Sequence, residues 1–170
     1  IGIGSIYGKM EMIKNKEDII MNKIKLASYI DHTILKPDAT EGELIKLCEE
    51  AKEHQFFSVC INPCYIEKAK ELLKGSETKI CTVVGFPLGQ MTTESKSYET
   101  KEAVFLGAEE VDMVINIGDV KNGDFDKVET EIRTLKETAG DKVLKVIVET
   151  CYLTEEEKIK LCQCVTNAKA

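Results

Sequence analysis

Four short apolar runs, rich in β-branched residues, recur along the chain from residue 57 onwards. Each run is too short for a helix and almost continuously hydrophobic, which is typical of a parallel strand buried on both faces. The runs follow one another at intervals of about 20 to 35 residues, long enough for helical crossovers between parallel strands. We therefore predict strands at 57–61, 80–84, 111–115 and 144–148.

Helix-start and helix-stop residues fill the intervals between these runs. Thr40 with Glu43 forms a capping box for a first helix that runs towards His54, and Thr154 with Glu157 forms another for the last helix. Proline, aspartate and glycine positions indicate three more helices, at 62–75, 93–107 and 124–140. The order is an N-terminal helix followed by four strand–helix units, which predicts an α/β fold. A doubly wound sheet and a partial (β/α)8 TIM barrel both fit, and a complete barrel would need about 250 residues.

The residue patterns near the two ends of the sequence predict the domain boundaries. The segment Met21-Asn22-Lys23 stands directly before the first patterned residues, at 24–30. We interpret residues 1–23 as an N-terminal extension, either mobile or non-native, and residues 24–170 as the N-terminal half of a barrel domain. The helical pattern continues to Ala170 without a cap, so we expect the domain to be cut short there.

Composition narrows the classes of function. The chain has 170 residues, of which 43% are hydrophobic, and carries 23 basic against 30 acidic residues for a net charge of -7. This acidic balance argues against nucleic-acid binding or attachment to a membrane surface, both of which need a basic face. The seven cysteines lack paired spacing and predict reduced thiols in a cytoplasmic protein. Two histidines and scattered carboxylates give no ligand spacing, so no metal site is predicted.

Charged residues inside the apolar runs are the first candidates for chemistry. Asp112 interrupts the third run and Lys145 the fourth. A buried lone charge costs several kcal/mol unless it is paired, and consecutive strands allow these two to pair. One interpretation is a plain buried ion pair, and the other is an acid/base carboxylate beside a lysine with a perturbed pKa.

Three further parts of the sequence allow two interpretations each. Asp31 and Thr33 precede the first predicted helix, either in a turn where they bond backbone amides or at the edge of a site. Cys60 lies within the first run, where a thiol serves as core filler or as a reactive group. The glycine- and proline-containing loop 85–89 follows the second run and suits either packing or phosphate binding.

Together these residues belong to five segments that resemble deoxyribose-phosphate aldolase, in the same order and spacing: 29–37, 58–63, 81–89, 110–118 and 144–151. The resemblance implies a class I aldolase with a (β/α)8 barrel that needs no metal and no cofactor. Such an enzyme reversibly cleaves 2-deoxy-D-ribose 5-phosphate into acetaldehyde and D-glyceraldehyde 3-phosphate. A lysine amine forms the Schiff base, which requires a depressed lysine pKa. The resemblance leaves assembly into a homo-oligomer open.

Residue roles follow from the same resemblance. Asp112 matches the aspartate that shuttles the proton, and Lys145 matches the strand lysine that sets its charge state. Asp31 and Thr33 match positions that line the substrate cleft, and Cys60 matches a thiol near the aldehyde pocket. The family's Schiff-base lysine lies in a Lys-Thr-Ser-Thr-Gly motif on the sixth strand, beyond Ala170. We therefore expect these residues alone to be inactive. The alternative is a non-catalytic half-barrel that binds sugar phosphates or assembles with a partner.

Overall fold

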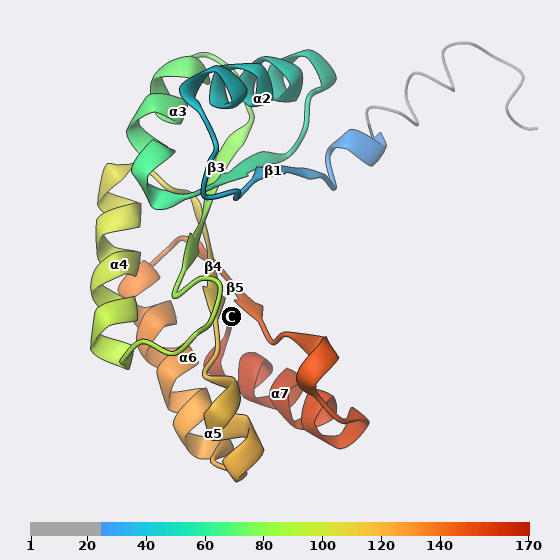
Figure 1. Ribbon diagram of the computed structural model, residues 1–170, viewed down its shortest axis with the longest axis vertical. Helices are drawn as coiled ribbons and strands as arrows, with labels where there is room; N and C mark the ends of the chain where they lie inside the picture. The colour runs from blue at the N-terminus through green and yellow to red at the C-terminus, as the bar shows by residue number, and fades with distance from the viewer. Residues whose placement is uncertain (1–24) are drawn as a thin grey trace, which may run out of the picture.

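The computed structural model describes residues 25–170, and the predicted extension at 1–23 lies outside the described residues. Within this range the chain forms one sheet of five strands in the order β1-β2-β3-β4-β5, with every neighbouring pair parallel (Figure 1). The strands are β1 (Asp31–Ile34), β2 (Ser58–Ile61), β3 (Lys79–Val84), β4 (Glu110–Val114) and β5 (Val143–Ile147). The α/β class and the four predicted strands are confirmed.

Sequential strand order separates the two architectures that the sequence allows. A doubly wound sheet reverses its strand order at a switch point, whereas a barrel adds each new strand on the same side of the previous one. The observed order is strictly sequential. It therefore matches part of a (β/α)8 barrel, with five strand–helix units where the sequence predicts four.

The additional strand is β1, where the sequence suggests a turn or the edge of a site. Its residues are Asp-His-Thr-Ile, so they show no hydrophobic run. The strand lies at the edge of the sheet and none of its side chains is fully buried. The parallel register that joins Asp31 to Ser58 and Thr33 to Cys60 gives the segment its strand conformation.

Helices fill the intervals between strands, as the caps predict. Both capping boxes form: the Thr40 hydroxyl accepts from the Glu43 amide, and the Thr154 hydroxyl accepts from the Glu157 amide. The α-helices are α2 (Glu41–His54), α3 (Ile66–Leu72), α4 (Thr93–Leu106), α5 (Ile117–Asn122), α6 (Phe125–Ala139) and α7 (Glu155–Ala168), with 3-10 turns η2 (Pro63–Tyr65) and η3 (Thr150–Tyr152). Helix α3 ends before the predicted stop at Gly75, and the short α5 is an addition.

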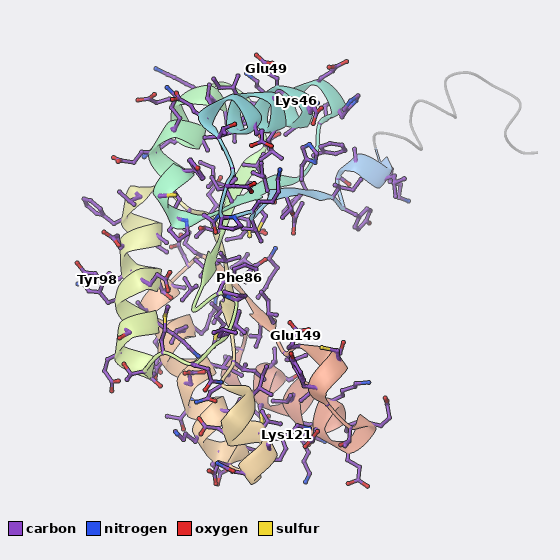
Figure 2. The ribbon with its side chains drawn as sticks, in the orientation of Figure 1. Lys46, Glu49, Phe86, Tyr98, Lys121 and Glu149 are labelled. Carbon is purple, nitrogen blue, oxygen red and sulfur yellow. The ribbon has the colours of Figure 1, made fainter. Side chains whose placement is uncertain are left out.

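The helices pack on one face of the sheet, as right-handed crossovers require. One apolar cluster, including Leu44, Ile61 and Ile66, joins α2 and α3 to β2 and β3. A second, including Met113 and Ile132, joins α6 and α7 to β4 and β5. Figure 2 shows charged and aromatic side chains on the outer sides of α2 and α4, among them Lys46, Glu49 and Tyr98. The opposite face carries a smaller apolar cluster of Cys60, Cys81 and Val83 beside the polar residues described below.

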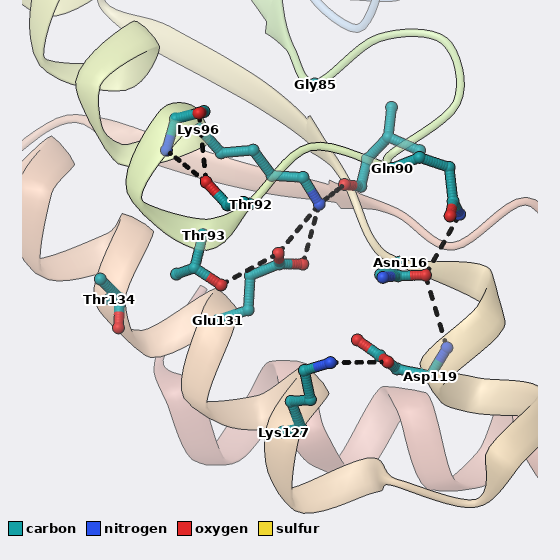
Figure 3. Close-up of polar contacts among 12 residues, drawn as sticks. Gly85, Gln90, Thr92, Thr93, Lys96, Asn116, Asp119, Lys127, Glu131 and Thr134 are labelled. Carbon is teal, nitrogen blue, oxygen red and sulfur yellow. Dashed lines mark hydrogen bonds and ion pairs between the residues drawn. The ribbon is translucent and has the colours of Figure 1, made fainter.

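A buried ion pair fixes the helix layer to the sheet. Lys96 on α4 is fully buried, and its Nζ donates to both carboxylate oxygens of Glu131 on α6, each at 3.0 Å. The same Nζ donates to the carbonyl oxygen of Val114 at the end of β4, at 2.8 Å (Figure 3). A Cβ at Gly85 would lie 3.0 Å from Lys96 Cε, so the glycine leaves the space that the lysine stem occupies. Among residues 25–170, no helix is long and apolar enough to span a bilayer.

Removing one partner of the Lys96–Glu131 ion pair should destabilise the fold. We expect Glu131→Leu to lower the free energy of unfolding by about 3–5 kcal/mol, because it leaves the Lys96 ammonium buried without its counter-charge. The double variant Lys96→Met/Glu131→Leu should recover most of that loss, since no charge is then buried. Urea unfolding followed by circular dichroism measures both.

The matched control is Lys127→Met, which breaks an ion pair with Asp119 whose lysine is 65% exposed. It should change the free energy of unfolding by less than about 1 kcal/mol. A Glu131→Leu loss as small as this control would contradict the assigned role of the buried pair.

Candidate active site

The face of the sheet opposite the helices carries an unusual set of polar side chains. Residues two apart on a strand point to the same face, so Glu110 and Asp112 on β4 share a face, as do Asp31 and Thr33 on β1. Lys145 on β5 lies in register with Asp112. The register therefore brings charged groups from the first strand and the last two strands into one interior region.

Lys145 is the centre of this region. Its Nζ lies 2.8 Å from Asp31 Oδ2, 3.1 Å from Glu110 Oε2 and 3.2 Å from Asp112 Oδ1. The contact with Asp31 connects residues 114 positions apart in the sequence. Asp31 also accepts a hydrogen bond from the Ser58 hydroxyl at 2.7 Å. We call Lys145 and its three carboxylates the Lys145 cluster. The sequence-based expectation that Asp112 and Lys145 lie together is confirmed in its geometry.

The pKa values of the two aspartates in the cluster shift in opposite directions. Burial raises the pKa of the Asp112 carboxyl, and the charge of Lys145 offsets this only in part, so its pKa lies above the usual range. Burial also raises the pKa of Asp31, but hydrogen bonds from Lys145 and Ser58 outweigh it and leave that pKa below its usual value. Of the two aspartates, Asp112 is therefore the one that takes up a proton more readily.

Lys145 stays charged at neutral pH. Burial acts to lower the pKa of its ammonium, but the hydrogen bond to Asp31 and the negative charges around it outweigh burial and raise that pKa well above its usual range. An amine must lose its proton before it can attack a carbonyl carbon. The arrangement suits Lys145 to holding carboxylates in place and not to nucleophilic attack.

Glu110 is the member of the cluster that sequence reasoning missed. It is almost completely buried at the start of β4, where a charged residue resembles the end of a loop. Its position two residues before Asp112 gave a usable signal, because that spacing places both carboxylates on one face of a strand. This spacing identifies Glu110 as a site residue only after Asp112 has been assigned to the interior face.

Two thiols adjoin the Lys145 cluster. Cys60 on β2 and Cys81 on β3 are buried and lie directly opposite each other in the parallel register. Their sulfur atoms and a carboxylate oxygen of Asp112 all lie within 4.8 Å of one another. The contact with the Cys60 thiol, together with burial, raises the pKa of Cys81. Cys60 therefore lies beside the acid/base candidate, although the sequence also allows it to be core filler.

Thr33, the remaining sequence-based candidate, and its neighbour His32 lie apart from these contacts. Thr33 is exposed, and its hydroxyl donates to the backbone oxygen of Asp31 at 2.8 Å. His32 points towards the helix layer, where its Nε2 lies 2.7 Å from Glu50 Oε2 on α2. The structure thus brings Asp31, Cys60, Asp112 and Lys145 together, with Thr33 at the margin.

The loop after β3 is shaped by close packing. Gly89 has φ +66°, and a Cβ at this position would lie only 1.9 Å from the carbonyl oxygen of Ile115. Beside it, Gln90 donates to the Asn116 side chain at 3.1 Å, and Asn116 caps α5 (Figure 3). The loops that follow β3 and β4 are therefore joined at the carboxyl edge of the sheet, where α/β barrels place their active sites.

Comparison with known proteins adds independent information. A family model described as "DeoC/LacD family aldolase" matches residues 25–167. The deoxyribose-phosphate aldolase of Brevibacillus brevis is 54% identical over 147 residues, which are 86% of this chain and 66% of that protein. The enzyme of the same name from Clostridium perfringens is 56% identical over 151 residues, 88% of this chain and 67% of that protein.

A solved structure agrees with these matches. The deoxyribose phosphate aldolase of Aeropyrum pernix, whose structure is described as a unique tetramer, superposes with a TM-score of 0.79 at 30% identity. The match covers 92% of this chain and 69% of that one. The chain thus spans about two thirds of the length of the curated relatives it matches.

The Lys145 cluster should affect how the free energy of unfolding depends on pH. Lys145→Met leaves Asp31, Glu110 and Asp112 without their cation, so burial should raise the folded-state pKa values of Asp31 and Asp112 above the unfolded values. Folded protein then binds more protons than unfolded protein, and stability rises as pH falls. We expect a loss of about 2–3 kcal/mol at pH 8 that shrinks clearly at pH 5. Urea unfolding at the two pH values measures it.

Lys46→Met provides the control, because Lys46 is 75% exposed and lies 3.7 Å from Glu50 on the outside of α2. Its effect should be small and nearly independent of pH. An effect of Lys145→Met that is equal at both pH values would contradict the proposed electrostatic coupling.

Proposed function

Because the chain belongs to the DeoC/LacD family of aldolases, we propose that the full-length protein reversibly cleaves 2-deoxy-D-ribose 5-phosphate into acetaldehyde and D-glyceraldehyde 3-phosphate. The observation that carries the proposal is the Lys145 cluster, which holds Asp112 beside an ammonium on the interior face of the sheet. It supplies a carboxyl with a raised pKa where a barrel aldolase needs a proton carrier.

The proposed chemistry is that of a class I aldolase. A neutral lysine amine adds to the substrate carbonyl and loses water to give a protonated imine. The hydroxyl on C3, two carbons from the imine carbon C1, gives up its proton, the C2–C3 bond breaks, and its electron pair moves towards the imine to form an enamine. D-Glyceraldehyde 3-phosphate leaves, the enamine is protonated at carbon, and water releases acetaldehyde and the amine.

In this scheme Asp112 is the catalytic acid and base. A general acid/base works best when its pKa lies near the operating pH, and burial moves the pKa of Asp112 in that direction. Lys145 is a positioning residue that holds Asp112 and Asp31 by charge. The Schiff-base lysine is a different residue, since Lys145 is held as an ammonium; the family resemblance assigns it to a strand that follows β5.

Asp31, Thr33 and Cys60 are proposed to line the substrate cleft. Asp31 reaches the Lys145 cluster, and Cys60 lies within 4.8 Å of Asp112 through its sulfur. Thr33 is exposed on β1, two residues from Asp31 and on the same face, where its hydroxyl can meet a polar substrate group. Oligomer formation stays a prediction for this chain.

The non-catalytic half-barrel is the competing proposal. Among the described strands, β1 and β5 each have a neighbour on one side only. Unpaired backbone groups at such edges can bond to another chain. This reading predicts an assembled protein that never cleaves the sugar phosphate.

Replacement of Asp112 tests the catalytic assignment. In the full-length protein we expect Asp112→Asn to lower kcat by about 10²–10⁴-fold, because the amide cannot carry the proton, with a smaller effect on KM. Release of D-glyceraldehyde 3-phosphate in a coupled assay measures both constants.

The control is Asp141→Asn, an exposed carboxylate between α6 and β5. It should leave kcat within about twofold of the parent, as surface substitutions usually do. A kcat for Asp112→Asn close to that of this control would remove Asp112 from the mechanism.

Borohydride trapping tests where the imine forms. We expect full-length protein treated with 2-deoxy-D-ribose 5-phosphate and borohydride to gain a reduced adduct on one lysine other than Lys145, located by peptide mapping. An adduct on Lys145 would overturn the assignment of an ammonium there. Absence of both adduct and cleavage in every assembly of the protein would favour the non-catalytic half-barrel.

A further inference from the structure

We propose that Cys60, Cys81 and Asp112 form a binding site for a thiophilic divalent cation such as Zn²⁺. Their sulfur and carboxylate oxygen atoms lie within 4.8 Å of one another on the interior face of the sheet. Three adjacent strands supply one ligand each, so the site depends on the fold and has no spacing signature in the sequence.

The sheet holds these ligands in a favourable arrangement. Cys60 and Cys81 are register partners on β2 and β3, so their thiols leave the same face side by side. Asp112 pairs with Val83, two residues beyond Cys81 on β3, which places its carboxylate diagonally next to that thiol. Tetrahedral zinc bonds of about 2.0–2.3 Å separate ligand atoms by roughly 3.5–3.8 Å. Small side-chain rotations would therefore bring the three atoms onto one ion.

A second observation comes from Asp112 itself. Its Oδ1 is buried, yet it accepts no hydrogen bond from any residue within 25–170. Lys145 Nζ lies 3.2 Å away, which gives attraction between charges without a hydrogen bond to that oxygen. Buried carboxylate oxygens are nearly always hydrogen-bonded, so this oxygen keeps an unused capacity to accept a further partner such as a cation. A cation bound between the thiols and Asp112 would satisfy the carboxylate.

Charge and donor type favour a soft cation. The Lys145 cluster has three carboxylates for one ammonium, and Lys145 keeps Asp31 and Glu110 as partners if Asp112 turns to a metal. Two thiolates with one carboxylate select Zn²⁺ or Cd²⁺ over Mg²⁺ and Ca²⁺. Each thiol loses its proton on binding, so one cation should release two protons, with a fourth coordination position left for water.

Occupation of this site would engage the carboxylate that the proposed function uses for proton transfer. Zn²⁺ should then inhibit the aldolase, a consequence that rests on the proposed function. Binding itself does not rest on it, so binding is measured without substrate.

The experiment uses full-length protein in which the exposed cysteines Cys64, Cys151 and Cys162 are replaced by serine, which removes surface thiols that also bind soft metals. Cd²⁺ alone is added in a thiol-free buffer, and the ultraviolet thiolate-to-cadmium charge-transfer band is followed together with proton release. We expect one Cd²⁺ and two protons per chain.

Three variants and a control identify the ligands. Cys60→Ala and Cys81→Ala should each weaken Cd²⁺ binding at least about tenfold and roughly halve the band, and Asp112→Asn should weaken binding while the band persists at saturation. Cys164→Ala removes a buried thiol on α7 whose sulfur faces the Phe125 carbonyl, and it should change nothing. Circular dichroism checks that each variant is folded.

Absence of the band in the parent, or a band unchanged by both Cys60→Ala and Cys81→Ala, would overturn the site. These readouts stand even if no aldolase activity is found, because neither uses the substrate. In an active enzyme, the appearance of the band without inhibition would contradict only the link to proton transfer.

Discussion

The ammonium of Lys145 is the interaction on which the interior face of this sheet depends. It links β5 to β1 across 114 positions of sequence and reaches two carboxylates on β4. Ion pairs, whether exposed or buried, seldom add much net stability, so stability alone does not explain this half-buried cluster. The ammonium acts to lower the pKa of both aspartates, but burial outweighs it at Asp112, so the pKa of Asp31 falls and that of Asp112 rises. Burial and one shared cation together thereby give the two aspartates different affinities for a proton.

A fully buried lysine, Lys96, shows what a purely structural pair looks like in the same protein. Lys96 gives hydrogen bonds to both oxygens of Glu131 and to a backbone carbonyl, so charge and hydrogen-bonding capacity are both satisfied. The Lys145 cluster instead leaves Asp112 Oδ1 without a hydrogen bond from the described part of the chain. Buried polar groups that are incompletely satisfied are more often found where a protein does chemistry. This contrast supports placing function on the interior face and assembly of the layers on the helix side.

Sequence reasoning succeeded where the physical signal is local. Strands β2 to β5 are short apolar runs, and the capping boxes at Thr40 and Thr154 are set by residues three positions apart. It did not find β1, because a polar four-residue edge strand is created by its pairing with β2. It found Asp112 and Lys145 as charges inside apolar runs, but it missed Glu110 and Cys81. A glutamate at the start of a strand and a thiol in an apolar strand both look ordinary until the register is known.

The electrostatics also limit where a Schiff-base lysine can lie. An amine becomes nucleophilic near neutral pH when burial or neighbouring cations depress its pKa. Around Lys145 the surroundings act in the opposite direction, since Asp31 and Asp112 raise its pKa. Carboxylates that surround an ammonium raise its pKa, so the same site cannot also supply a neutral amine near neutral pH. Under the proposed function, we therefore infer that the nucleophile lies in a less acidic part of the barrel than the surroundings of Lys145.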